Sequence, residues 1–214
     1  MSSPRDDIMA AIHRALGPER AERRGAACRR VSQSPRNLIP ARARVPELVP
    51  LFEEMAVGAA ASVERIATMP DVPAAARRFL ASQGLPANAV LADNLPALDW
   101  AAAGFDVRTG APSPEDAASI TGSIAGIAES GTVMVASGAG HPHTLNLTVA
   151  AHVVVLRASD IVGPLEDAWK RLEGAMPRTV LWITGPSRTA DVGQRILFGA
   201  HGPRALHILI VESD

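Results

Sequence analysis

Apolar residues recur along the chain in two patterns, which predict alternating helices and strands from residue 46 onward. Short aliphatic and β-branched runs are typical of strands buried on both faces. Apolar residues at three- and four-residue spacing predict amphipathic helices. The predicted strands are Ser62–Ile66, Ala89–Ala92, Phe105–Arg108, Thr132–Ala136, His152–Leu156, Thr179–Thr184 and Leu206–Val211. The predicted helices are Glu47–Gly58, Val72–Gln83, Leu98–Ala103, Ile161–Glu173 and Ala190–Phe198.

Such an alternation indicates an α/β fold with a largely parallel sheet that is covered on both faces. In sheets of this kind the ligand crevice lies outside the carboxyl ends of the strands. This rule directs attention to the loops after Ala136, Leu156 and Thr184, and to the loop before Thr132.

The N-terminal part of the chain has a different character. Asp7–Leu16 has helical spacing, with Asp6 or Asp7 as a cap and Gly17-Pro18 as a stop, and residues 18–46 are expected to be a linker. We therefore predict an N-terminal helix and basic linker in residues 1–45, followed by one α/β domain in residues 46–214.

Charge is uneven between these two parts. Residues 1–45 carry 10 basic and 4 acidic residues, a net +6, whereas the remainder is −7, which gives −1 for the chain. A basic arm can bind nucleic acid or other anions. No aromatic residue is interleaved with these charges, so a solvated tail is favoured and nucleic acid is not expected as a partner.

The single cysteine, Cys28, excludes a disulfide within the chain and a cluster held by several of its own thiolates. Residues 1–7 lack the apolar segment of a secretory signal, and no apolar run is long enough to span a membrane. A cytoplasmic protein is the expectation.

The segment Gly185–Asp191 follows a predicted buried strand and opens a predicted helix. Free backbone N–H groups there, with the Ser187 and Thr189 hydroxyls and Arg188, would suit a carboxylate or phosphate. An ordinary capped loop explains the same residues. The segment contains no phosphate-loop lysine and no Gly-x-Gly-x-x-Gly pattern, so a nucleotide is not implied.

The turn Glu129-Ser130-Gly131-Thr132 precedes another predicted strand. Glu129 could act as a general base or a covalent nucleophile, with backbone N–H groups near Gly131 and Thr132 polarising a substrate. A carboxylate that accepts local backbone hydrogen bonds is the alternative.

Two histidine-containing loops complete the candidates. His201 and Arg204 follow Gly199 and could bind an anion or transfer a proton, although His201 could equally cap the preceding helix. His141 and His143 could ligate a metal, but no carboxylate lies close in sequence, so a loop that closes over a small ligand is favoured and no metal is predicted.

In this order the stretches resemble the LUD-domain family, in particular its LutC branch. Asp7–Gly17 is similar to the opening helix of the family, and Ile124–Thr132 is similar to its central motif, with Ser130 in place of the usual threonine. Ile183–Val192 and Phe198–Ile208 resemble its final motifs. The good match covers residues 119–211 and the first helix.

The resemblance implies a Rossmann-like three-layer α/β sandwich of the NagB/RpiA/CoA transferase-like type. It implies a component of L-lactate utilisation, the oxidation of L-lactate to pyruvate, with iron–sulfur clusters carried by partner proteins and none by this chain. Whether the chain itself is an enzyme stays open. It could be a self-sufficient small-anion enzyme, an isomerase or acyl transferase using Glu129, or a ligand-sensing module.

Overall fold

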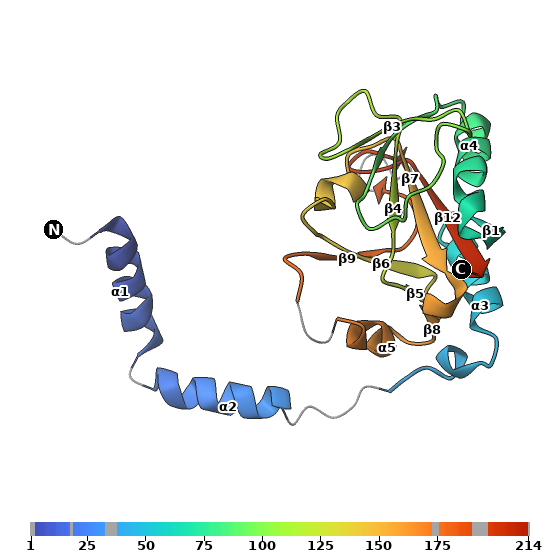
Figure 1. Ribbon diagram of the computed structural model, residues 1–214. Coiled ribbons are helices and arrows are strands. Elements are labelled where there is room, and N and C mark those ends of the chain that lie inside the picture. The colour runs from blue at the N-terminus through green and yellow to red at the C-terminus, as the bar shows by residue number, and fades with distance from the viewer. Residues whose placement is uncertain (1–2, 18, 33–37, 173–175, 190–196, 214) are drawn as a thin grey trace. The chain divides into compact units, whose positions relative to one another are not determined.

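The structure is a computed structural model that describes residues 3–17, 19–32, 38–172, 176–189 and 197–213 (Figure 1). The chain divides into two compact units, Met1–Leu38 and Ile39–Asp214.

The first unit contains α1 (Pro4–Leu16) and α2 (Arg20–Ser32). The predicted first helix is confirmed, but its cap is Ser3, whose hydroxyl accepts the Asp6 N–H while the Asp6 carboxylate accepts the Ser3 N–H. The expected linker was wrong over α2, because a segment rich in arginine and alanine has high helix propensity.

The second unit is built on a six-stranded sheet with the order β1-β12-β7-β4-β2-β3. Every neighbouring pair in it is parallel, which confirms the predicted α/β class with a mostly parallel sheet. Its strands are β1 (Ser62–Thr68), β2 (Asn88–Leu91), β3 (Asp106–Thr109), β4 (Ala118–Gly122), β7 (Ala151–Arg157) and β12 (Ala205–Ser213). All were predicted to within about two residues except β4, which was missed.

One face of this sheet packs against α4 (Val72–Ser82), which the 3₁₀ turn η2 (Met69–Asp71) leads into. The helix buries Val72, Ala76 and Leu80 against alternate strand residues such as Val153 and Leu209. This alternation is the strand period of two, and it gives the opposite face to Val154 and Ile208.

The opposite face packs against a second sheet with the order β8-β5-β6-β9 and against α3 (Leu48–Gly58). The strands are β5 (Ala125–Ile127), β6 (Thr132–Ala136), β8 (Ile161–Val162) and β9 (Val180–Ile183). The pairs β5–β6 and β6–β9 are antiparallel. The outer face of this second sheet is covered by α5 (Leu165–Lys170).

Short elements complete the unit. These are η1 (Ala41–Arg44), η3 (His143–Asn146), η4 (Ala158–Asp160) and the two-stranded pair β10 (Arg188–Thr189) and β11 (Leu197–Phe198). The alanine at 43, within the expected linker, is buried.

Three predicted helices differ from the structure. Leu98–Ala103 forms turns, because Trp100 is buried while its neighbours face solvent. Ile161–Glu173 is divided into β8 and the shorter α5, with Gly163 and Pro164 between them. The predicted helix Ala190–Phe198 lies outside the described residues over 190–196, and its last two residues form β11.

Candidate functional site

A cavity lies between the two sheets, at the amino ends of β7 and β12. It measures about 280 Å³. Its lining residues are Asn146, Leu147, His152, Leu181–Ser187, His201–Pro203 and Leu206. The amino ends lie opposite to the strand carboxyl ends at which the rule for parallel sheets places crevices, although the loop after Thr184, which was among the predicted loops, does line the cavity. Ala136 and Thr184 also belong to the second sheet or its loops, where that rule does not apply.

His152 and Asn146 form the floor of this cavity. His152 is fully buried, and its Nε2 lies 2.9 Å from the Thr121 Oγ1 on the neighbouring strand β4. Its Nδ1 has no hydrogen-bond partner among the described residues. Burial, with a smaller contribution from the nearby His141, lowers the pKa of His152 to about 3, so the floor imidazole is neutral at pH 7.

His141 supports the floor of the cavity through a contact with Asn146. Its Nε2 lies 3.3 Å from the Asn146 Oδ1, so this nitrogen is the donor and carries the hydrogen. The Asn146 amide also donates to the carbonyl of His143. The loop is tied back where the N–H of Gly140 donates to the Asp93 carboxylate at 3.0 Å. Burial lowers the pKa of His141, against opposing contributions from Asn146 and Asp93.

The alternative metal interpretation of His141 and His143, which the sequence did not favour, gains no support from the described residues. The two histidines separate, since His141 is buried and the residue at 143 is exposed. Within the ranges that the structure describes, no group of three or more histidine, cysteine, aspartate or glutamate side chains is placed to hold a metal.

The mouth of the cavity consists of its exposed lining residues, Leu147, Thr184 and His201. The structure brings the predicted residues Gly185, Ser187 and His201 together at this cavity. Arg204 instead lines two neighbouring hollows, each of which shares residues with the cavity. No lysine or arginine is among the described residues that line the cavity itself.

Arg188 and Thr189 do not open a helix. They form β10, which pairs with β11. The predicted cap at Thr189 and the helix N-terminus beyond it would require residues 190–196, which lie outside the described residues.

The turn that contains Glu129 lies against the helix α5. The Glu129 Oε1 accepts the N–H of Leu165 at 3.0 Å, at the start of that helix, and the Glu129 N–H donates to Gly163. Gly131 lies so close to α3 that a Cβ there would overlap the backbone of Ala56. These contacts are structural, and a catalytic role for Glu129 stays a prediction.

Hydroxyl groups connect this turn with the cavity. The Ser130 Oγ lies 2.7 Å from the Thr132 Oγ1, which lies 2.7 Å from the Thr184 Oγ1 at the mouth. Thr132 is buried. These hydroxyl contacts join the start of β6 to the end of β9.

His152 and Asn146 were missed as site residues. The signal available for His152 was a lone histidine at the start of an otherwise aliphatic strand, His-Val-Val-Val-Leu. This pattern more often marks a satisfied core histidine. Only the packing of the second sheet shows that the ring borders a cavity.

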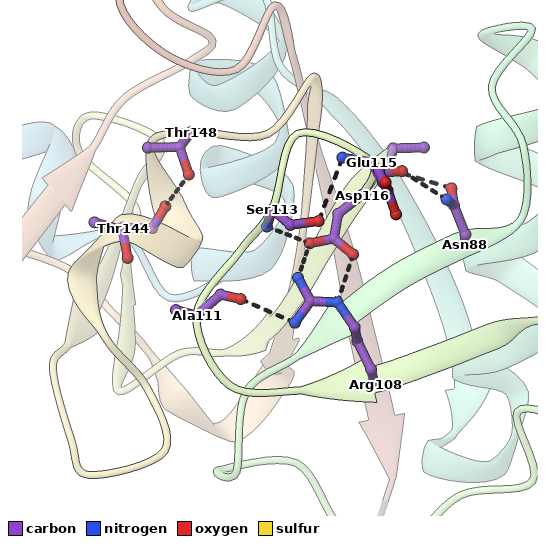
Figure 2. Close-up of polar contacts among 9 residues, drawn as sticks. Asn88, Arg108, Ala111, Ser113, Glu115, Asp116, Thr144 and Thr148 are labelled. Carbon is purple, nitrogen blue, oxygen red and sulfur yellow. Dashed lines mark hydrogen bonds and ion pairs between the residues drawn. The ribbon is translucent and has the colours of Figure 1, made fainter.

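The loop before β4 is fixed by an ionic contact at the same end of the sheet. Figure 2 shows Arg108 facing the buried Asp116, with the Arg108 Nε 2.9 Å from Oδ1 and the Ser113 N–H 2.6 Å from Oδ2. Asn88 bridges the adjoining backbone at Glu115. The contact fixes the start of β4, the strand that carries Thr121.

Replacing Asp116 with alanine should lower the free energy of unfolding by about 2 kcal/mol, because the Ser113 N–H and the Arg108 guanidinium lose a buried acceptor. Urea unfolding measures the change. Asp106→Ala, at an exposed position of β3, should stay within about 0.5 kcal/mol of wild type. Equal effects of the two substitutions would contradict this assignment.

No helix in the described part of the chain is long and apolar enough to cross a membrane.

Comparison with known proteins adds a family match. The model of the LUD domain family matches residues 52–211. An uncharacterized protein from Neisseria meningitidis serogroup B is 38% identical over 100 residues, 45% of this chain and 43% of that protein. Lactate utilization protein C from Shouchella clausii is 31% identical over 98 residues, again 43% of its length. The matched segment thus spans less than half of these two relatives.

Two Deinococcus radiodurans comparisons cover more of the chain. Its lactate utilization protein C is 27% identical over 188 residues, 81% of this chain and 84% of that protein. The crystal structure of a DUF162 family protein matches with a TM-score of 0.60 at 24% identity, over 80% of this chain and 99% of the other. At that identity the likeness shows the fold.

Proposed function

The chain belongs to the LUD domain family, and from this premise we propose that it is a component of L-lactate utilisation that binds a small carboxylate in the cavity between the two sheets. Several relatives carry the name lactate utilization protein C. The proposed role is ligand binding within that system.

The observation that carries the proposal is the cavity floor. A buried polar atom without a partner costs about 1–3 kcal/mol, and the His152 Nδ1 is such an atom on a residue that lines the cavity. A bound ligand with a hydrogen-bonding oxygen would remove that cost. A concave, mostly apolar cavity with few convergent polar groups is the usual form of a small-molecule site.

The oxidation of L-lactate to pyruvate releases electrons, which other groups must accept. The chain has one cysteine, whereas iron–sulfur clusters are held by several thiolates. We therefore assign the clusters to separate iron–sulfur proteins that act together with this chain. Co-purification of such proteins with the tagged chain would support this partnership.

Growth on L-lactate tests the function. In the host of this gene, deletion should abolish growth on L-lactate as sole carbon source, and the wild-type gene should restore it. Ser187→Trp, which fills the cavity from a half-buried lining position, should fail to restore growth. Ser159→Trp, at an exposed position outside the lining, should restore it.

Two results would overturn the proposal. One is undiminished growth of the deletion strain on L-lactate. The other is full restoration of growth by Ser187→Trp, provided that both tryptophan variants accumulate as folded protein.

Glu129→Gln distinguishes two roles of that carboxylate. The glutamine amide oxygen can still accept the Leu165 N–H, so the fold should persist. Loss of growth by a folded Glu129→Gln variant would assign catalysis to Glu129, whereas normal growth would leave it a structural role.

A further inference from the structure

The two ends of the cavity differ in polarity. At the floor, the Nδ1 of the fully buried His152 is unpartnered, and Asn146 is its polar neighbour in the lining. Neither side chain supplies positive charge at neutral pH, since burial keeps the His152 ring neutral. A buried carboxylate without a countercharge is costly. The floor therefore suits an uncharged oxygen, either a hydroxyl or a carbonyl.

The mouth suits a negative charge instead. His201 is exposed there, and Ser187 lines the cavity beside it. Arg204 is exposed and lines the hollow that shares Leu147 and Gly202 with the cavity. A carboxylate at the mouth keeps part of its hydration and lies on the side where these cationic or polar groups are found.

The size of the cavity exceeds the needs of lactate. An engineered apolar cavity of about 150 Å³ encloses benzene, which has as many non-hydrogen atoms as lactate. A cavity of about 280 Å³ has nearly twice that room. The β9 residues Leu181 and Ile183, which we call the apolar wall, border the cavity on the inner face of the second sheet, whereas the Trp182 side chain packs against Trp169 on the outer face.

We propose that the cavity binds 2-hydroxy or 2-oxo carboxylates with a bulky apolar side chain more tightly than it binds lactate. In this arrangement the oxygen at C2 meets the His152 Nδ1, the carboxylate lies at the mouth beside His201, and the side chain packs against the apolar wall. The inference rests on the proposed ligand-binding function and specifies the class of ligand.

A ligand series measured on the purified full chain by calorimetry tests the inference. 2-Hydroxy-4-methylpentanoate should bind at least about tenfold more tightly than L-lactate, because its added carbons are buried against the wall. 4-Methylpentanoate, which lacks only the hydroxyl, should bind about tenfold more weakly than its hydroxy acid, because the floor imidazole then stays unpaired.

Single substitutions test each proposed ligand contact separately. His152→Phe should remove the preference for the hydroxyl while the preference for the bulky side chain persists. Ile183→Trp, at a half-buried wall position, should abolish the bulky preference and retain lactate binding. His143→Gln, on the same loop as His141 but exposed and outside the lining, should behave as wild type.

The outcomes separate this inference from the proposed function. Equal or weaker binding of the bulky hydroxy acid, with measurable lactate binding, overturns the inference alone. Absence of binding by both hydroxy acids also overturns it, while the growth experiment decides the function. Bulky-acid binding in a chain whose deletion leaves growth on lactate unchanged would overturn the function and retain the ligand class.

Discussion

Gly131→Ala should lower the free energy of unfolding by about 4 kcal/mol, a large fraction of the total stability of a typical domain. Gly131 has φ +64°, in the left-handed region that side chains rarely adopt. A Cβ there would also overlap backbone atoms of Met55 and Ala56 in α3. Backbone cannot rotate aside as a side chain can, so α3 would have to separate from the turn between β5 and β6.

Two other glycines separate the cost of the left-handed φ from the cost of the backbone overlap. Gly84 has a nearly identical φ of +65° but nothing within 4 Å of a Cβ, so Gly84→Ala should cost only about 1 kcal/mol. At Gly163 a Cβ would overlap the carbonyl of Ala43, and φ lies outside the left-handed region, so Gly163→Ala measures the overlap alone. Urea unfolding of the three variants provides the comparison. A Gly131→Ala variant no less stable than Gly84→Ala would contradict the close packing.

The close packing at Gly131 also gives a structural reason for the glycine in the motif around Glu129. The glycine in that motif invited a functional interpretation, because glycine permits close backbone approach to a ligand. In the structure the approaching backbone is α3. Gly185 repeats the arrangement, since a Cβ there would overlap the carbonyl of Ala59 just after α3. Both glycines thus position the second sheet, and with it the wall of the cavity.

The elements that the sequence predicted best are those whose signal is local. The runs Val153–Leu156 in β7 and Ile208–Val211 in β12 are aliphatic throughout, and α4 has a clear apolar face before Gly84. β4 was missed because Ala118–Gly122 has only one large apolar residue, Ile120, and ends in glycine, so it lacks the continuous aliphatic run of the neighbouring strands. It is held between β2 and β7 by tertiary pairing.

The candidate site was predictable only in part, for a related reason. Ser187 and His201 follow glycine-containing loops that attract attention in any sequence, and they do reach the cavity. The floor depends on which face of β7 meets the second sheet. That sheet was not anticipated, because the segments of β6 and β9 were assigned to one parallel sheet with the others and β5 was not predicted as a strand. His152 therefore looked like an ordinary core residue.

Acidification from pH 7.5 to pH 5 should lower the free energy of unfolding by about 4 kcal/mol. Burial lowers the pKa of His152 to about 3 and that of His207 to about 4, from a value of 6.5 in the unfolded chain. At pH 5 the rings of His152 and His207 are mostly protonated in the unfolded chain but mostly neutral in the folded protein. Each imidazole then contributes a loss of about 2 kcal/mol. The pKa of His141 is also lowered, which adds a loss of the same sign.

The sign follows from the direction of these shifts. Because the folded pKa values lie below the unfolded value, stability is complete above about pH 6.5 and is lost progressively as the pH falls toward 3. Urea unfolding between pH 7.5 and pH 5 measures the slope. His152→Gln, which cannot take up a proton, should reduce that slope by about 1.4 kcal/mol per pH unit below pH 6, whatever its effect on absolute stability. An unchanged slope in this variant would mean that the His152 ring takes up a proton in the folded protein as readily as in the unfolded chain, and burial would then not keep the floor uncharged in the acidic range.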